Sequence, residues 1–420
     1  MTRRRLLLFP LLFLPLGPLV AQSPASQKPY VVLVSLDGFR YDYAERYHAT
    51  NILALGKAGA TAKAMVPSFP SVTFPNHISI VTGMYPGHHG IVGNSFFDPE
   101  RKARYGMKDA PTEGAFMRAK PLWVVAEEQH VKSACMFWPM SDSEIMGVRP
   151  SYWKQYDGSV PNLRRVTQVL DWLTLPESER PHFITLYFSD VDSAGHSHGP
   201  DSAEVEQAVQ RLDKLIGALW AGIQTLPLPV NLIVVSDHGM QTVGQTFSIG
   251  DLADFSKVQV VNNEMLLSVY APDAAAAESL YQSLKGKSDK FEIYRRKETP
   301  ARWHYSEDPR IGDLVIMAKG PNMINVRPLN GGNGGRGNGG RGNGGRGGGG
   351  GARGAHGFDP AEFPTMNAIF YAAGANIKPG VVLEPFENVN VFPFITKVLG
   401  LTNPPNLDGS ESALAGIYKQ

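Results

Sequence analysis

The fold is indicated first by an apolar stretch near the start of the chain, Val31-Val32-Leu33-Val34-Ser35-Leu36-Asp37-Gly38. A short, almost continuous apolar run is typical of a strand that is buried on both faces of a parallel sheet. The run ends at an acidic residue followed by glycine. We therefore expect a functional loop at the carboxyl end of this strand, where open α/β sheets bind their ligands.

Three further apolar runs have the same form. They are residues 183–188, which end near Asp190 and Asp192, residues 231–236, which end at Asp237-His238-Gly239, and residues 368–374. Helical periodicity lies between them, as in residues 203–224 with one apolar face made by Val205, Ala208, Leu212, Ile216 and Leu219. This alternation predicts the α/β class, with a mainly parallel sheet covered by helices on both sides.

Two segments depart from this pattern. Residues 242–327 hold several short strand patterns and one helix near residues 274–284, and they predict a smaller α+β insert against the main sheet. Residues 331–354 repeat glycine, arginine and asparagine, a composition that cannot bury a core, so we expect a disordered loop. Although arginine–glycine tracts can contact nucleic acid, this one has few arginines and lies in a nearly neutral protein.

Composition sets limits on function and on cellular location. The net charge of +1 over 420 residues argues against binding of a nucleic-acid polymer. The single cysteine, Cys135, excludes an intramolecular disulfide, and its apolar neighbours predict that it is buried.

Residues 1–21 predict a cleaved signal peptide, because Arg3 to Arg5 precede an apolar run that is broken by prolines. We expect an exported protein, periplasmic or extracellular, monomeric and without a membrane anchor after cleavage.

Thr73 is the candidate nucleophile. Pro75 suits the first turn of a helix, so Thr73 would lie at a helix N-terminus, where backbone N–H groups favour anions. A threonine hydroxyl needs a base or a metal to become a nucleophile at neutral pH. Taken alone, the segment more simply predicts a threonine that caps a helix.

Acidic residues and histidines follow the predicted strands and the glycine-rich tract. Such side chains are ligands that zinc accepts, and two metals about 4 Å apart need six or seven of them. One Asp-His pair would more simply be a structural hydrogen bond, but so many ionisable groups at one edge of a sheet are costly without a metal. The candidate ligands, besides Thr73, are Asp37, Asp192, His196, Asp237, His238 and His356.

Six motifs follow one another along the chain, at residues 36–39, 70–77, 83–94, 192–200, 236–240 and 356–359. These motifs and their order resemble the nucleotide pyrophosphatase/phosphodiesterase family of the alkaline phosphatase superfamily. The resemblance extends from about residue 30 to the C-terminus, apart from the glycine-rich tract. It implies an alkaline-phosphatase-like core, a catalytic domain over residues 29–420, and hydrolysis of nucleotides to nucleoside 5′-monophosphates.

The resemblance also implies roles for the candidate residues. Two Zn²⁺ ions would be bound, and a phosphothreonine would form on Thr73 and then be hydrolysed. Asn94 and the Thr73 N–H would stabilise a phosphoryl oxygen. Phe74 and Tyr156 fall where the family holds a base. One zinc would be held by Asp37, Thr73, Asp237 and His238, and the other by Asp192, His196 and His356.

Other functions remain open at this point. A phosphomonoesterase of the same superfamily would need cationic side chains near Thr73, and the sequence shows none beside it. A lysophospholipid or phosphocholine phosphodiesterase would need an acid-lined aromatic pocket, which sequence does not settle. A sulfatase is disfavoured by the surroundings of Cys135. A non-catalytic metal-binding protein would be expected to lack the nucleophile or some ligands.

Trp123 and Trp138 are interpreted as core residues.

Overall fold

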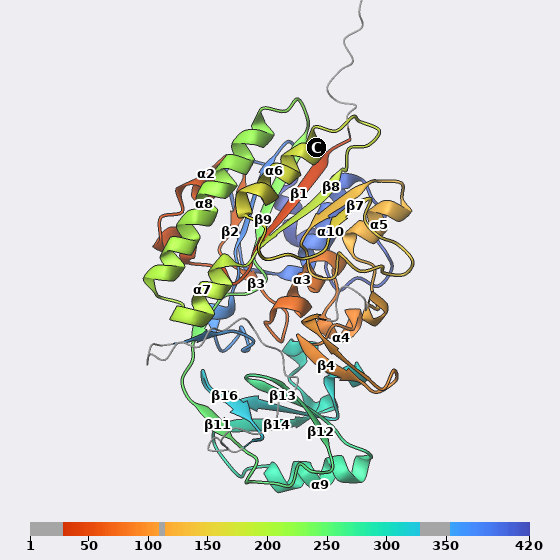
Figure 1. Cartoon of the computed structure of the whole chain (residues 1–420), viewed down its shortest axis with the longest axis vertical. Helices are drawn as coiled ribbons and strands as arrows, with labels where there is room; N and C mark the ends of the chain where they lie inside the picture. The colour runs from red at the N-terminus through yellow and green to blue at the C-terminus, as the bar shows by residue number, and fades with distance from the viewer. Residues whose placement is uncertain (1–27, 109–113, 328–352) are drawn as a thin grey trace, which may run out of the picture.

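The structure is a computed structural model that describes residues 28–108, 114–327 and 353–420 (Figure 1). The predicted signal peptide, residues 1–21, lies outside the described residues. So does all but the last part of the predicted glycine-rich loop, residues 331–354.

The centre of the molecule is an eight-stranded sheet with the order β19-β2-β18-β9-β1-β8-β6-β7. The strands from β9 to β7 are all parallel, and β18 is antiparallel to both of its neighbours. The predicted mainly parallel sheet is therefore confirmed, although the last predicted strand runs against the others. The strands are β1 (Tyr30–Leu36), β2 (Ala60–Ala62), β6 (Ser133–Met136), β7 (Tyr152–Lys154), β8 (Phe183–Phe188), β9 (Val230–Val235), β18 (Phe370–Gly374) and β19 (Val381–Leu383).

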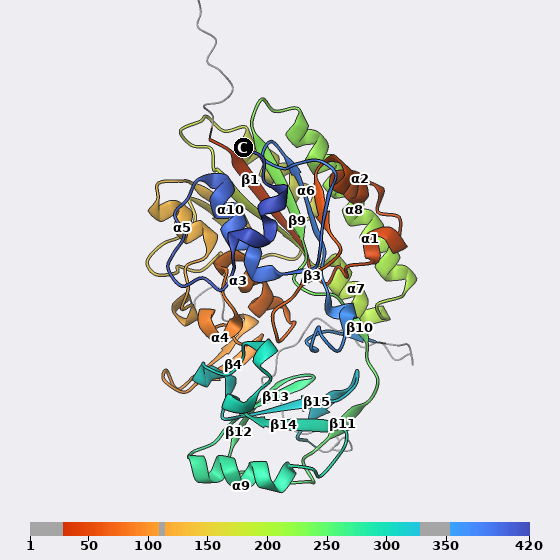
Figure 2. The same cartoon turned by 180° about the vertical axis from the view of Figure 1, so that it is seen from behind.

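Helices cover both faces of this sheet (Figures 1 and 2). Side chains of β1 alternate between two cores, with Val31 and Leu33 in one and Val32 and Val34 in the other. The first core is closed by α3 (Thr73–Thr82), α5 (Leu122–Glu128) and α10 (Val391–Leu399). The second is closed by α2 (Thr50–Ala58), α6 (Asn162–Leu173) and α8 (Ala203–Gln224), whose predicted apolar face is buried.

A second, four-stranded antiparallel sheet lies within residues 242–327. Its order is β12-β13-β15-β14, made by β12 (Gln259–Asn263), β13 (Leu266–Tyr270), β15 (Leu314–Ala318) and β14 (Phe291–Arg295). One face packs with α9 (Ala274–Leu284), and the other contributes Leu266 and Val315 to the first core. Figure 1 places this sheet beyond the end of the main sheet, next to β4 (Ser95–Asp98), and not on one of its faces.

Short elements complete the fold. The short helices are α1 (Tyr43–Arg46), α4 (Pro86–His89) and α7 (Asp190–His198), which contact α2, α3 and α8 respectively. Cys135, Trp123 and Trp138 are buried, as predicted. No helix in the described part of the chain is both long and apolar enough to cross a membrane. The remaining strands pair two by two: β4 with β5 (Ala103–Gly106), β3 (Met65–Val66) with β20 (Phe386–Glu387), β10 (Gln241–Thr242) with β17 (Gly354–Ala355), and β11 (Thr246–Ser248) with β16 (Met323–Asn325).

Candidate active site

The candidate ligands meet at the carboxyl ends of three neighbouring parallel strands. Asp37 follows β1, Asp237 follows β9, and Asp192 lies in α7 just after β8. The Asp192 N–H donates to the Asp37 carbonyl oxygen over 3.1 Å. Gly38, with φ +68°, makes this approach possible, because a Cβ on it would lie 2.8 Å from the Asp192 Cα. The β1–α7 contact thus depends on glycine at this position.

One group of side chains surrounds the hydroxyl of Thr73, the first residue of α3. The Thr73 Oγ1 lies 3.4 Å from His238 Nε2. The same nitrogen is 3.0 Å from Asp237 Oδ2 and 3.6 Å from Asp37 Oδ1. The structure therefore brings together the four residues expected at the first zinc.

A second group lies directly beside the first. His196 Nε2 is 3.3 Å from Asp192 Oδ1 and 3.0 Å from His356 Nε2. His356 stacks on His238 with ring centroids 3.6 Å apart, so the two groups are in direct contact through these rings. All three residues expected at the second zinc are therefore close together, although His356 lies 160 residues after His196 in the sequence.

Each of the three histidines has its Nδ1 fixed by a backbone carbonyl. His196 donates to Gly354 O over 3.0 Å, His238 to Gly239 O over 2.8 Å, and His356 to the carbonyl of Ser71 over 3.1 Å. A proton on Nδ1 leaves Nε2 as the lone-pair nitrogen in the neutral ring, which is the arrangement of metal-ligating histidines. All three Nε2 atoms point into the cluster.

The carboxylates are suited to the same purpose. Asp37 Oδ1, Asp192 Oδ1 and Asp237 Oδ2 are buried and accept no hydrogen bond from any described residue. A buried carboxylate oxygen without a partner is costly, and a cation removes that cost. Three carboxylate oxygens accept no hydrogen bond within the described part of the chain, and three histidine Nε2 atoms point toward them. This set of possible ligand atoms fits a pair of divalent metals.

In the absence of a metal, the clustered side chains shift one another's pKa values. Burial, together with Asp237 and Asp192, raises the pKa of Asp37 well above its usual range. Burial opposes the charge of Asp192, but His196 prevails and lowers the pKa of Asp192 to about 2. In turn Asp192 overcomes the effect of burial on His196 and raises its pKa to about 9. Burial and the neighbouring histidines lower the pKa of His356. Protons thus partly compensate the buried negative charge that a metal would neutralise.

The remaining predicted residues lie around the Thr73 hydroxyl. The Phe74 N–H donates to Asn94 Oδ1 over 2.9 Å, which fixes the amide and leaves its Nδ2 as a free donor among the described residues. Phe74 is half-buried, with its ring 6.4 Å from that of Tyr105. Tyr156 is 49% exposed and contacts Phe137 and Tyr187. Among the described residues no ring contact joins Phe74 to Tyr156.

Two residues not assigned from the sequence support the site. The Tyr187 hydroxyl donates to Asp37 Oδ2 over 2.6 Å. His77 contacts Ser35 Oγ through Nε2 at 2.8 Å and the Thr73 carbonyl through Nδ1 at 2.9 Å. Its Nδ1 is also 3.3 Å from Asp237 Oδ2, so its ligand atoms lie close to those of Asp37 and Asp237. His77 also lies four residues after Thr73 on a helix, a spacing that could have suggested this contact. The position of Tyr187 has no comparable signal in the sequence.

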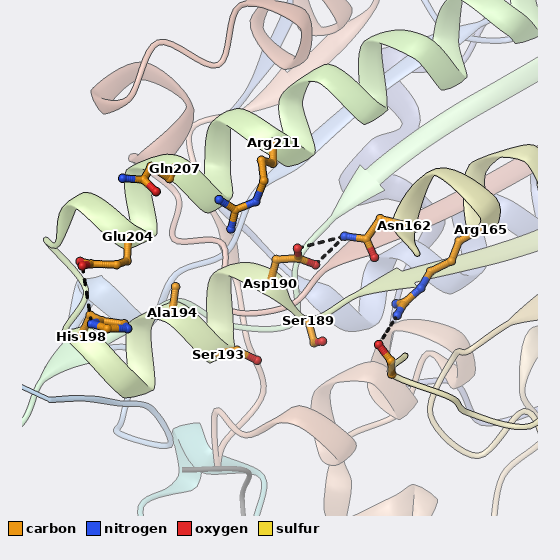
Figure 3. A pocket seen from close by; sticks show the side chains of 11 residues that line it. Asn162, Arg165, Ser189, Asp190, Ser193, Ala194, His198, Glu204, Gln207 and Arg211 are labelled. Carbon is orange, nitrogen blue, oxygen red and sulfur yellow. Dashed lines mark hydrogen bonds and ion pairs between the residues drawn. The ribbon is translucent and has the colours of Figure 1, made fainter. Parts of the chain in front are cut away.

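The outer side of α7 faces a polar hollow and not the cluster of aspartates and histidines (Figure 3). There His198 lies 3.8 Å from Glu204, and Asn162 donates to both oxygens of Asp190. Asp190, which ends the second predicted strand motif, is therefore not part of the cluster. The two faces of α7 thus separate His196 from His198.

With this geometry established, the chain can be compared with known proteins. Residues 31–359 match the family described as type I phosphodiesterase / nucleotide pyrophosphatase. The chain belongs to this family. Both the family recognised from the motifs and the expected alkaline-phosphatase-like fold are confirmed.

Curated relatives come from animals and yeast. Ectonucleotide pyrophosphatase/phosphodiesterase family member 1 of Mus musculus is 36% identical over 417 residues, which are 95% of this chain and 44% of the relative. A pyrophosphatase/phosphodiesterase of Schizosaccharomyces pombe is 32% identical, over 91% of this chain and 79% of the relative. The chain thus spans less than half the length of the mouse, rat and human family member 1 proteins.

A solved structure extends the comparison. Murine ectonucleotide pyrophosphatase/phosphodiesterase 5 superposes with a TM-score of 0.83 and 25% identity, covering 93% of this chain and 100% of the other. That protein was solved as an inactive threonine-to-alanine variant in complex with AMP.

Proposed function

We propose that this family member is an exported, monomeric, zinc-dependent phosphodiesterase that cleaves phosphodiester and pyrophosphate bonds of nucleotides and releases nucleoside 5′-monophosphates. The observation that carries the proposal is the placement of the Thr73 hydroxyl, at a helix N-terminus, against two adjoining Asp/His groups with unpartnered oxygens. The inactive threonine-to-alanine variant and the AMP complex of the murine relative support it.

Zinc is the metal that the ligand set favours. The mixture of imidazole nitrogens and carboxylate oxygens suits zinc better than magnesium or calcium, which prefer oxygen ligands. Asp37, Thr73, Asp237 and His238 would hold one ion, and Asp192, His196 and His356 the other. Two such ions supply positive charge that lowers the pKa of a bound hydroxyl and neutralises phosphoryl oxygens.

The residues of the chain have the following roles in the two steps of the reaction. The Thr73 oxygen attacks phosphorus, a bond from Oγ1 to phosphorus forms, and the bond to the leaving-group oxygen breaks. Asn94 Nδ2 and the Thr73 N–H donate to a non-bridging oxygen as its charge grows. The hydroxyl proton of Thr73 ends on the leaving alcohol, and the intermediate is a diester that joins Oγ1 to the nucleotide. Water then attacks phosphorus from the vacated side, the bond from phosphorus to Oγ1 breaks, Oγ1 takes a proton from that water, and the nucleoside 5′-monophosphate leaves. His77 holds the Thr73 carbonyl throughout.

A base-binding role is proposed for Phe74 and Tyr156. Phe74 adjoins Thr73, Tyr156 contacts the Tyr187 ring, and both side chains remain partly open to solvent. We expect Tyr156→Ala to raise KM for a nucleotide ester about 5- to 100-fold, because stacking of one base contributes about 1–3 kcal/mol. Steady-state kinetics with thymidine 5′-monophosphate nitrophenyl ester would measure this. KM for bis-nitrophenyl phosphate, which has no base, should change little, and an equal rise for both substrates would contradict base stacking.

The proposed activity is tested by three nitrophenyl substrates: the thymidine 5′-monophosphate ester, bis-nitrophenyl phosphate and nitrophenyl phosphate. We expect the nucleotide ester to be hydrolysed fastest and the monoester slowest, with activity lost on chelation and restored by zinc. A preference for nitrophenyl phosphate would make the protein a phosphomonoesterase. Turnover of lysophospholipid or phosphocholine esters alone would favour the lipid alternative, and no turnover of any ester by zinc-loaded protein would favour a non-catalytic role.

A further inference from the structure

The turn between β12 and β13 reaches from the second sheet to the active site. Asn263 makes reciprocal hydrogen bonds with Ser95, next to Asn94: Ser95 N donates to Asn263 Oδ1 over 3.3 Å, and Asn263 Nδ2 donates to Ser95 O over 3.1 Å. On the other side of the turn, buried Met265 packs directly on Gly357, so a Cβ there would displace the end of the methionine side chain. The turn therefore contacts both the Asn94 loop and the segment that carries His356.

Glu264 lies at the apex of this turn. Its backbone is in the left-handed region, with φ 69°, a conformation that favours glycine or asparagine. The backbone is held there on both sides, since its N–H donates to Asn262 Oδ1 over 2.6 Å and its carbonyl accepts from Ile324 N over 2.8 Å. The side chain is exposed and has no hydrogen bond or ion pair with any described residue. Packing thus fixes the position of this glutamate without using its carboxylate.

The negative charge of Glu264 lies beside the active-site loops. The residue before it, Asn263, is bonded to the neighbour of Asn94, and the residue after it, Met265, packs on the neighbour of His356. Both contacts hold the charged turn at the edge of the site, where a partly screened charge still acts over several ångströms. At this rim a phosphomonoesterase would need a cation, whereas this chain presents an unpaired anion.

We propose that Glu264 is a specificity residue that disfavours phosphoryl groups carrying more than one negative charge. This inference rests on the proposed function and deepens it. A diester carries one negative charge at the phosphoryl group, whereas a monoester or inorganic phosphate carries about two at neutral pH. Repulsion by Glu264 therefore weakens binding of monoesters and phosphate more than binding of diesters, and favours release of the product.

The test measures binding of inorganic phosphate to zinc-loaded protein by titration calorimetry, in wild type, Glu264→Gln and Glu264→Lys. We expect Kd to fall about 3- to 10-fold in Glu264→Gln, as for a partly screened charge pair, and further in Glu264→Lys. The change should shrink at high ionic strength. The ratio of kcat/KM for nitrophenyl phosphate over bis-nitrophenyl phosphate should rise in the same order.

Asp289→Asn is the matched control, since it removes an exposed negative charge from the turn before β14 and should leave Kd unchanged. Equal phosphate affinity in all Glu264 variants at low salt would overturn the inference, even if the wild type cleaves diesters. Phosphate affinity that follows the charge at position 264, in a protein that cleaves no ester, would support the inference while the proposed function fails.

Discussion

Thr73→Ala should lower kcat for a nucleotide diester by about 10⁴- to 10⁶-fold, the loss typical of a removed nucleophile. The reason is that the neighbouring groups are built around this hydroxyl and offer no substitute for it. His77 has both nitrogens engaged, and Asn94 can only donate an N–H to substrate or accept from Phe74. Stopped-flow or steady-state release of nitrophenol would measure the loss.

Thr73→Ser is the control for this prediction, because it keeps the hydroxyl and should retain measurable turnover. Zinc content should stay near the wild-type value in the alanine variant, since Asp37, Asp237 and His238 remain. A peptide containing residue 73 with a covalently attached nucleotide, isolated after acid quench, should appear in wild type and be absent from the alanine variant. An alanine variant within tenfold of wild type would remove Thr73 from the mechanism.

The sequence was sufficient for the part of the site that depends on regular structure. Strands of one parallel sheet end at a common edge, so the residues after each apolar run are brought together whatever the loops do. This is why Asp37, Asp192 and Asp237 can be grouped from the sequence alone. His196 follows Asp192 by one helical turn, so its place depends on the same local rule.

His356 could not be placed in this way. It follows a glycine-rich tract, and its position depends on the pairing of β17 with β10, a two-residue ladder with no apolar pattern. The sequence could name it as a candidate ligand, but its role at the second zinc came only from the family resemblance. An apolar run also does not show in which direction its strand crosses the sheet. β18 is antiparallel to β9, although its composition matches that of the parallel strands.

Residues that act through tertiary contacts were also beyond sequence reasoning. Tyr187 is an ordinary inward residue of a buried strand until the fold places its hydroxyl on Asp37. Glu264 is an exposed charge in a turn, and it gains significance only because Asn263 and Met265 attach that turn to the active-site loops. In both cases the determining fact is which segments lie side by side.

His196→Ala should remove one of the two proposed zinc ions and lower turnover more than 100-fold. Mutation of groups that merely orient a ligand costs about 10- to 100-fold in metal affinity or activity, and His196 would contact the metal directly. Its loss leaves Asp192 Oδ1 and His356 Nε2 without their nearest neighbour. Zinc content per chain, measured by elemental analysis after gel filtration, should fall from two toward one.

His198→Ala is a closely matched control. The residue is the same, the helix is the same, and the position is only two residues away, but His198 faces Glu204 on the outer side of α7 (Figure 3). Its removal should leave zinc content and turnover close to those of wild type. If both variants lost the same amount of zinc, the loss would come from a damaged α7, and the assignment of His196 as a ligand would fail. If His196→Ala kept two zinc ions and full activity, the proposed second metal group would be wrong, and His238, whose ligand atoms also lie close to Asp192 and His356, would be the histidine that holds the second ion.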